Sequence, residues 1–144
     1  MLLKIALNAV AWTVIQLGLV ALGNRLPCRY LAICAPKWER HGRVYHSLGI
    51  RSWKDTLPDA GGWFTGGYEK RKLCGRDITS LDRFAREARR GELVHWCAIG
   101  ALPLFKLWNS WPGMMINAAY VVAANLPCIL VQRYNRARIA RLLR

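Results

Sequence analysis

The sequence predicts an all-α fold: a small polytopic membrane protein with about three transmembrane helices and a cytoplasmic basic segment of interfacial and amphipathic helices. Two observations predict this class. Hydrophobic residues make up 53% of the 144 residues, yet the formal net charge is +14. The apolar residues gather in three blocks, and Lys and Arg fill the stretches between them. This segregation is typical of an integral membrane protein and argues against a basic nucleic-acid-binding domain. The length predicts a single domain, residues 1–144.

The first apolar block covers residues 5–23 and carries no charge. It is long enough to cross most of the ~30 Å hydrocarbon core as a helix. A cleaved signal peptide is the alternative, because residues 21–23 have the small-x-small pattern of a cleavage site. Lys4 is the only basic residue before the block, however, and the stretch after it is densely basic, which disfavours export. A retained transmembrane helix is therefore favoured.

The second and third blocks cover residues 93–108 and 114–132 and are separated by a short connection, so they predict a helical hairpin in the membrane. Pro103 and Pro127 predict kinks or breaks, which a membrane helix tolerates where neighbouring helices satisfy the freed backbone groups. The second block is short and contains Lys106. The sequence leaves open whether it spans fully or is re-entrant.

The basic residues predict the orientation of these helices. Residues 24–92 carry fifteen Lys and Arg, and residues 133–144 carry five and no acidic residue. Both segments should therefore be cytoplasmic. The expected location is the cell membrane, with three crossings, the N-terminus outside and the C-terminus in the cytoplasm. Trp96, Trp108 and Trp111 fall near the predicted membrane edges, where indole rings concentrate.

Three parts of the cytoplasmic segment have distinct patterns. Residues 28–50 mix apolar and basic positions and predict helix lying along the interface. Residues 57–70 form a Gly-rich stretch that matches no dinucleotide-binding or P-loop pattern, so its glycines are expected to serve turns. Residues 77–92 predict an amphipathic helix, capped by Asp77 or Thr79, that continues into the second apolar block.

The cysteines predict neither a disulfide framework nor a metal site. Their number, five, is odd, and no CxxC pair occurs. Zinc would need Cys and His ligands paired at short spacing, which the sequence lacks.

Glu92 and His95 lie three residues apart where the basic segment meets the second apolar block. On a helix these positions share a face. A carboxylate beside an imidazole orients the ring and raises its basicity, which is what a general base needs. The ordinary alternative is a carboxylate at the start of a helix and an interfacial histidine, both solvated, and the spacing alone slightly favours it.

Residues 45–61 hold a second group of functional side chains. Asp55 is a candidate second carboxylate for His95, and Lys54 and Arg51 are candidates for binding phosphates or a carboxylate. The alternative is a solvated loop with a surface ion pair.

Arg133 and Asn135 stand at the edge of the third block and are candidates for contact with a lipid headgroup or a donor phosphate. The other arginines of residues 133–144 are sufficiently explained by topology and by attraction to anionic lipids.

Three motifs together resemble a known family. They are W-K-D-x-L-P at residues 53–58, R-G-E-x-x-H-W at 90–96 and Q-R-Y-N-R at 132–136. With their surroundings, from about residue 45 to 143, they resemble the glycosyl-4,4'-diaponeurosporenoate acyltransferase family, small membrane enzymes of staphyloxanthin-type carotenoid synthesis and their relatives. The resemblance implies transfer of a fatty acyl group onto a sugar hydroxyl of a membrane glycolipid or carotenoid glycoside. It also implies a cytosolic acyl-CoA or acyl-carrier-protein thioester as co-substrate, with no bound cofactor.

An O-acyltransferase of this kind should act at the cytoplasmic face of the membrane, where a water-borne donor and a lipid acceptor meet. His95 is the expected base, oriented by Glu92 or Asp55. The expected substrate-binding side chains, which would contact donor phosphates, the developing oxyanion or the lipid, are Arg51, Trp53, Lys54, Trp96, Arg133 and Asn135.

Two other functional classes stay open. A non-catalytic membrane scaffold that binds anionic lipid and a biosynthetic partner needs only apolar blocks and basic flanks. A lipid phosphotransferase or hydrolase would normally need an acidic metal-binding cluster, and the eight acidic residues form no obvious one. Expected partners are membrane lipids and the acyl donor, with no nucleic acid. Self-association to enclose the site is an open expectation.

Overall fold

A computed structural model of the chain describes residues 2–31, 36–57, 75 and 77–143. All regular structure in these residues is helical, which confirms the predicted all-α class. The Gly-rich stretch lies outside the described residues from position 58 onward. The elements in chain order are α1 (Leu2–Asn24), η1 (Cys28–Tyr30), η2 (Lys37–Leu48), α2 (Ile50–Trp53), η3 (Lys54–Thr56), α3 (Ile78–Gly100), η5 (Leu102–Leu107) and α4 (Trp111–Leu142).

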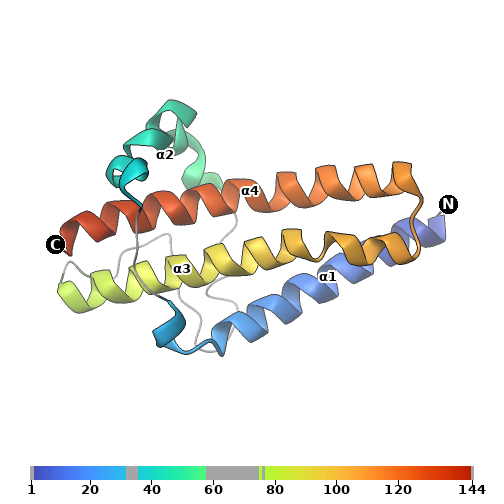
Figure 1. Cartoon of the computed structure of the whole chain (residues 1–144), viewed down its shortest axis with the longest axis horizontal. Helices are drawn as coiled ribbons and strands as arrows, with labels where there is room; N and C mark the ends of the chain where they lie inside the picture. The colour runs from blue at the N-terminus through green and yellow to red at the C-terminus, as the bar shows by residue number, and fades with distance from the viewer. Residues whose placement is uncertain (1, 32–35, 58–74, 76, 144) are drawn as a thin grey trace.

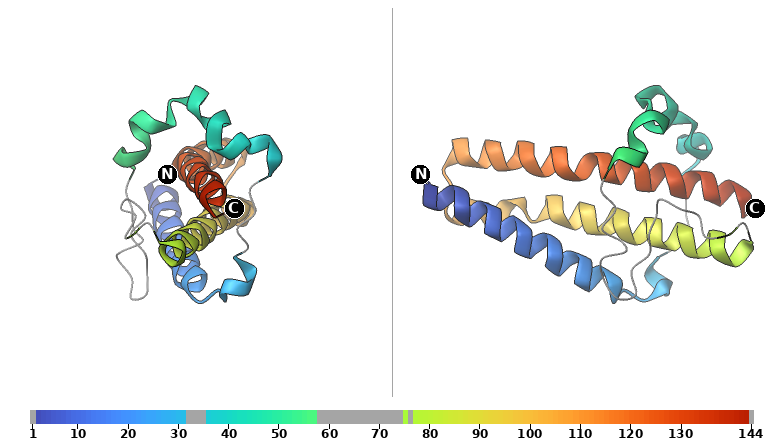
Figure 2. Two further views of the ribbon diagram at one scale, coloured as in Figure 1. Left: turned by 90° about the vertical axis from the view of Figure 1, so that its left-hand side faces the viewer. Right: turned by 180° about the vertical axis from the view of Figure 1, so that it is seen from behind.

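The three long helices lie side by side, and the short helices pack on one of them. Figure 1 shows α3 and α4 running antiparallel along almost their whole lengths. Over most of its length α4 lies on one side of α3, and α1 lies on the other side at an angle to both. The short helices between residues 37 and 56 lie against the C-terminal half of α4 (Figures 1 and 2). In both figures α4 therefore stands between these short helices and α3.

Two helices, α1 and α4, are long and apolar enough to cross a membrane by length and composition. The apolar side chains of α1 are mostly exposed, for example Leu3, Val10 and Val14, as expected of a helix whose surroundings are hydrocarbon. These helices indicate that the protein associates with a membrane.

The third apolar block and the basic tail form one continuous helix, α4. It has 32 residues, so at 1.5 Å per residue it is about 48 Å long and exceeds the ~30 Å hydrocarbon core by roughly 18 Å. The helix continues through Pro127, so the break considered there does not occur. The basic end of α4 thus continues the same helix beyond the apolar part of the bundle.

The helix α3 begins at the predicted cap and ends near the predicted break. The side chain of Asp77 accepts a hydrogen bond from the backbone N–H of Ser80 at 3.0 Å, which confirms one of the two expected caps. α3 then runs without interruption from the amphipathic stretch into the second apolar block and ends at Gly100. The rest of that block forms the 3₁₀ helix η5, with Pro103 in its first turn, because proline lacks the N–H that would continue α3. Residues 93–108 are thus divided between two elements.

Apolar clusters join the elements at both ends of the bundle. Trp12 of α1 stacks on Phe105 of η5, with ring centroids 4.1 Å apart, and both pack with Val121 of α4. At the other end, Leu81 and Phe84 of α3 pack against Ile139 of α4, so the hairpin continues along the basic half of both helices.

Within the predicted segment 28–50, the described residues are mostly helical, as 3₁₀ helix at Cys28–Tyr30 and Lys37–Leu48. Gly49, with a φ of +60°, adopts the left-handed conformation that joins η2 to α2, which glycine accepts at little cost. Tyr45 and Ile50 are buried against Tyr134 of α4. This cluster holds the short helices on α4.

Candidate functional site

The imidazole of His95 bonds to a buried amide of α4. Its Nδ1 lies 2.8 Å from Oδ1 of Asn125, a side chain that is only 1% exposed. The same oxygen accepts a hydrogen bond from Nε2 of Gln16, on α1, at 3.2 Å. The ring of His95 is half-buried. Side chains from all three long helices therefore meet at this point.

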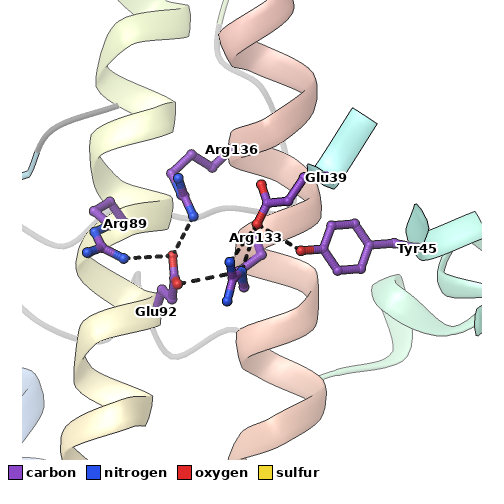
Figure 3. Close-up of polar contacts among 6 residues, drawn as sticks. All are labelled: Glu39, Tyr45, Arg89, Glu92, Arg133 and Arg136. Atoms are coloured by element: carbon purple, nitrogen blue, oxygen red, sulfur yellow. Dashed lines mark hydrogen bonds and ion pairs between the residues drawn. The ribbon is translucent and has the colours of Figure 1, made fainter. Parts of the chain in front are cut away.

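Glu92, one turn before His95 on α3, is surrounded by arginines. Its Oε2 lies 3.1 Å from Nη2 of Arg136 and 3.2 Å from Nη1 of Arg89, and its Oε1 lies 3.8 Å from Nε of Arg133 (Figure 3). Glu92 is 2% exposed and Arg136 is 3% exposed. The carboxylate that was expected to orient His95 thus serves as the counter-ion of basic side chains on α3 and α4.

Glu39 of η2 extends this group of charges across α4. Its Oε1 accepts hydrogen bonds from Nε and Nη2 of Arg133, at 2.8 and 2.7 Å, and from the hydroxyl of Tyr45 at 3.0 Å (Figure 3). Burial is the main cause that raises the pKa of Tyr45 to about 12, and the hydrogen bond to Glu39 and its charge act in the same direction. We call Glu39, Arg89, Glu92, Arg133 and Arg136 the ionic cluster.

The ionic cluster links three elements that are far apart in the sequence. Arg133 contacts both carboxylates, one on η2 and one on α3. Three guanidinium groups against two carboxylates leave one net positive charge. Such paired, buried charges fix the relative positions of helices well, because each charge is costly to bury without its partner.

The four candidates on α2 and η3 lie on the outer side of α4. Arg51 is exposed and donates from Nε to the hydroxyl of Tyr134 at 3.3 Å, and the Trp53 indole donates to the carbonyl of Leu48. Lys54 pairs with Asp55, whose side chain is 66% exposed.

This arrangement brings Arg51 near the C-terminal half of α4. It gives no support to Asp55 as a second carboxylate for His95, since α4 stands between α3 and η3 (Figure 2).

The two remaining candidates lie on the surfaces of α3 and α4. Trp96 follows His95 and is 44% exposed. Asn135 is half-buried next to the fully buried Tyr134. Among the residues that the structure describes, no three His, Cys, Asp or Glu side chains are grouped so that they could hold a metal ion.

Sequence reasoning missed several residues of this region. The sequence patterns singled out neither Asn125 nor Glu39, and they included Arg136 only as part of the Q-R-Y-N-R motif. One signal was available: Asn109, Asn117 and Asn125 recur every eight residues through an otherwise apolar stretch. Amides are costly in hydrocarbon unless another helix bonds them, so their recurrence indicates a buried helix–helix contact.

The fold and site define a membrane-associated helical protein in which an imidazole, a buried amide and an ionic cluster lie between closely packed helices. The comparisons with known proteins give this class a family. The family model described as glycosyl-4,4'-diaponeurosporenoate acyltransferase matches residues 29–144. Proteins of that name from Staphylococcus aureus strains MRSA252 and USA300 are each 33% identical over 141 residues, covering 92% of this chain and 84% of the relative. No solved structure matches.

The chain therefore belongs to the glycosyl-4,4'-diaponeurosporenoate acyltransferase family. This membership confirms the resemblance seen in its motifs and makes the chain an acyltransferase. The match to the family model begins after α1, so Gln16 lies outside the matched residues.

Proposed function

We propose that this protein transfers a fatty acyl group from a cytosolic thioester to a sugar hydroxyl of a membrane glycolipid or carotenoid glycoside. The name of its relatives supports a glycosylated carotenoid acid as acceptor. The single observation that carries the mechanism is the fixed ring of His95, bonded through Nδ1 to a buried amide. When Nδ1 donates to this amide, the lone pair of the neutral ring lies on Nε2, the nitrogen that would accept a proton.

The reaction requires one proton acceptor and no resident cofactor. Nε2 of His95 takes the proton of the sugar hydroxyl as its oxygen attacks the thioester carbonyl, and a C–O bond forms. The tetrahedral intermediate collapses, the C–S bond breaks, and the departing thiolate takes the proton back from His95. The products are an ester and a free thiol, of CoA or of an acyl-carrier protein, and the enzyme is returned unchanged.

In this proposal His95 lies just inside the cytoplasmic edge of the bilayer, and its contacts with the apolar helices support this depth. Gln16, at the same level, stands seven residues before the end of the first apolar block. At 1.5 Å per residue this is about 10 Å from the cytoplasmic edge. An acceptor lipid would then reach His95 sideways from the membrane, and Trp96, exposed on the adjacent position of α3, would contact its apolar part.

The donor would approach from the cytoplasmic side. Arg51 is exposed there, Lys54 is only partly covered, and Asn135 lies nearby on α4. Their charges and amide suit the phosphates of a nucleotide-linked thioester or an acidic carrier protein. Glu92 would act indirectly, by holding Arg133 and Arg136 in place.

The proposed topology has three crossings. They are α1, the apolar end of α3 with η5, and the first part of α4, with the N-terminus outside and the basic ends of α3 and α4 in the cytoplasm. The segregation of basic residues supports this orientation.

The test is lipid mass spectrometry on cells producing the wild-type protein or His95→Gln, followed by the reaction of purified protein in nanodiscs with acyl-CoA and a glycosylated carotenoid. We expect His95→Gln to insert normally and to lose about 100-fold or more of the activity. His46→Gln is the matched control, because His46 is exposed on η2. Near-normal activity of His95→Gln would exclude His95 as the base. A wild-type protein that is needed in cells but forms no ester when purified would favour the scaffold instead.

A further inference from the structure

We infer that Asn125 is a positioning residue for His95, fixing the ring in the Nδ1–H tautomer so that Nε2 is the basic nitrogen, and that α1 supports this amide through Gln16. The inference rests on the function proposed above, and it names the groups that orient the proposed base. Each step follows from which atoms donate and which accept hydrogen bonds.

The orientation of the Asn125 amide is set by the backbone of its own helix. Its Nδ2 donates to the carbonyl oxygen of Val121 at 2.8 Å. A carbonyl can only accept, so the NH₂ group must face Val121 and Oδ1 must face away from it. Gln16 confirms this direction, because its Nε2 donates to Oδ1 at 3.2 Å.

The tautomer of His95 follows from that orientation. Its Nδ1 lies 2.8 Å from Oδ1 of Asn125, and an amide oxygen has no proton to give. The proton in this hydrogen bond therefore belongs to Nδ1. In the neutral ring Nε2 then carries the lone pair, which is what removal of a proton from a sugar hydroxyl requires.

An amide suits this position better than the carboxylate that the sequence suggested. Glu92 is engaged by three arginines, whereas Asn125 is 1% exposed and level with the apolar part of α1. A charge at this depth would be expensive. A neutral amide orients the ring without that cost, and its burial keeps water from taking its place.

The same local structure occurs at Asn117, which provides an internal control. Its Nδ2 donates to the carbonyl of Gly113 at 2.9 Å, and its Oδ1 accepts from the Trp12 indole of α1 at 2.8 Å. Asn117 thus links α4 to α1 as Asn125 does, but its described acceptor contact is with an indole. Replacing each by leucine removes one α1–α4 link, and only Asn125→Leu also removes the acceptor for His95.

The experiment compares Asn125→Leu and Asn117→Leu, purified in nanodiscs. We expect Asn125→Leu to lower kcat by about 10- to 100-fold with the KM for acyl-CoA changed by less than about 2-fold, since a lost orienting hydrogen bond acts on proton transfer rather than donor binding. Asn117→Leu should retain kcat within about 3-fold. Equal losses in the two variants would show that Asn125 serves only to dock α1, and would overturn the inference.

A spectroscopic measurement tests the tautomer independently of activity. In ¹⁵N-histidine-labelled protein, the ring of His95, assigned by its loss in His95→Gln, should show a protonated Nδ1 and an unprotonated Nε2 at neutral pH. In Asn125→Leu the signal should move toward the Nε2–H form. A wild-type Nε2–H ring, or a tautomer unchanged in Asn125→Leu, would overturn the inference even if His95 proves to be the base.

Should Asn125→Leu not fold, Asn125→Gln replaces it, because this variant keeps a neutral amide with an acceptor oxygen. It should keep the Nδ1–H tautomer and at least about a tenth of the wild-type kcat. Loss of the Nδ1–H form in Asn125→Gln would count against the inference. If His95→Gln is active but the wild-type ring is in the Nδ1–H form, the proposal that His95 is the base fails. The hydrogen-bond assignment for Asn125 is then still correct.

Discussion

Arg136 donates from Nη2 to Oε2 of Glu92 over 3.1 Å, and both side chains are almost completely buried between α3 and α4 (Figure 3). The basic end of α4 therefore takes part in the packing between the two helices. One of its arginines faces inward and pairs with the carboxylate that precedes His95 by one turn. Removing one member of a buried pair leaves an uncompensated charge, whereas removing both can be nearly neutral.

We therefore expect Glu92→Leu to lower the free energy of unfolding by about 3–5 kcal/mol, and Glu92→Leu/Arg136→Leu to recover much of this loss. Unfolding in detergent micelles, followed by circular dichroism, measures both. Arg141→Leu is the control, because Arg141 is exposed near the end of the same helix. If the losses measured in Glu92→Leu and in Arg136→Leu alone simply add in the double variant, the residues are not energetically paired.

Tyr45 should make the stability dependent on pH in the alkaline range. Its pKa is raised to about 12, mainly by burial and then by its hydrogen bond to Glu39. The unfolded value is about 10. Since the folded state holds the proton more tightly, this contribution is complete below about pH 10 and is lost as the pH rises from 10 through 12.

Absorbance of phenolate at 295 nm measures this titration. Tyr45→Phe should remove the component that ionises at the highest pH, and its unfolding free energy should depend less on pH between 10 and 12 than that of the wild type. Tyr30→Phe is the control, because Tyr30 is 59% exposed. A high-pH component that survives in Tyr45→Phe would contradict the prediction.

Gly23 should be the position on α1 least tolerant of a side chain. A Cβ built there would lie 2.6 Å from Cγ2 of Val94 on α3, closer than real contacts allow. Valine is stiff about χ1, so it cannot easily move aside. Gly18, one turn and a half earlier, faces open space. We expect Gly23→Leu to cost about 1–3 kcal/mol of unfolding free energy, and Gly18→Leu to be tolerated in a lipid environment. Similar melting temperatures for the two variants would show that α1 does not pack closely on α3.

Local patterns predicted the elements that depend on local physics. The amphipathic repeat and the cap at Asp77 predicted the start of α3, and Pro103 predicted where its α-helical part ends. The apolar blocks predicted α1 and the first part of α4 as membrane helices. These features depend on residues within a few positions of each other, so periodicity and proline chemistry are enough to find them.

The site depends on contacts between distant residues, which the sequence does not reveal. Glu39 meets Arg133 across 94 positions, and Gln16 meets Asn125 across 109. The i and i+3 spacing placed Glu92 and His95 on one face, but packing decides their partners: arginines on α4 compete for the carboxylate, and an amide on α4 bonds the ring. Neither competitor can be identified before the register of α3 against α4 is known.

The proposed topology makes opposite predictions for two exposed cysteines. Cys28 follows α1 in the segment proposed to be cytoplasmic, and Cys97 lies on α3, two residues after His95; both are exposed in the structure. In a bilayer, however, the surface around Cys97 would face hydrocarbon, which polar reagents do not enter.

Variants that retain only Cys28 or only Cys97 should therefore differ in how their thiol reacts with a membrane-impermeant maleimide. Cys28 should react in inside-out vesicles and stay unmodified in right-side-out vesicles. Cys97 should react in neither, yet react fully after unfolding in dodecyl sulfate, which controls for its intrinsic reactivity. Labelling of Cys28 from the outer face would reverse the orientation. Rapid labelling of Cys97 in intact vesicles would place the end of α3 in water, and an acceptor lipid could not then reach His95 through the membrane.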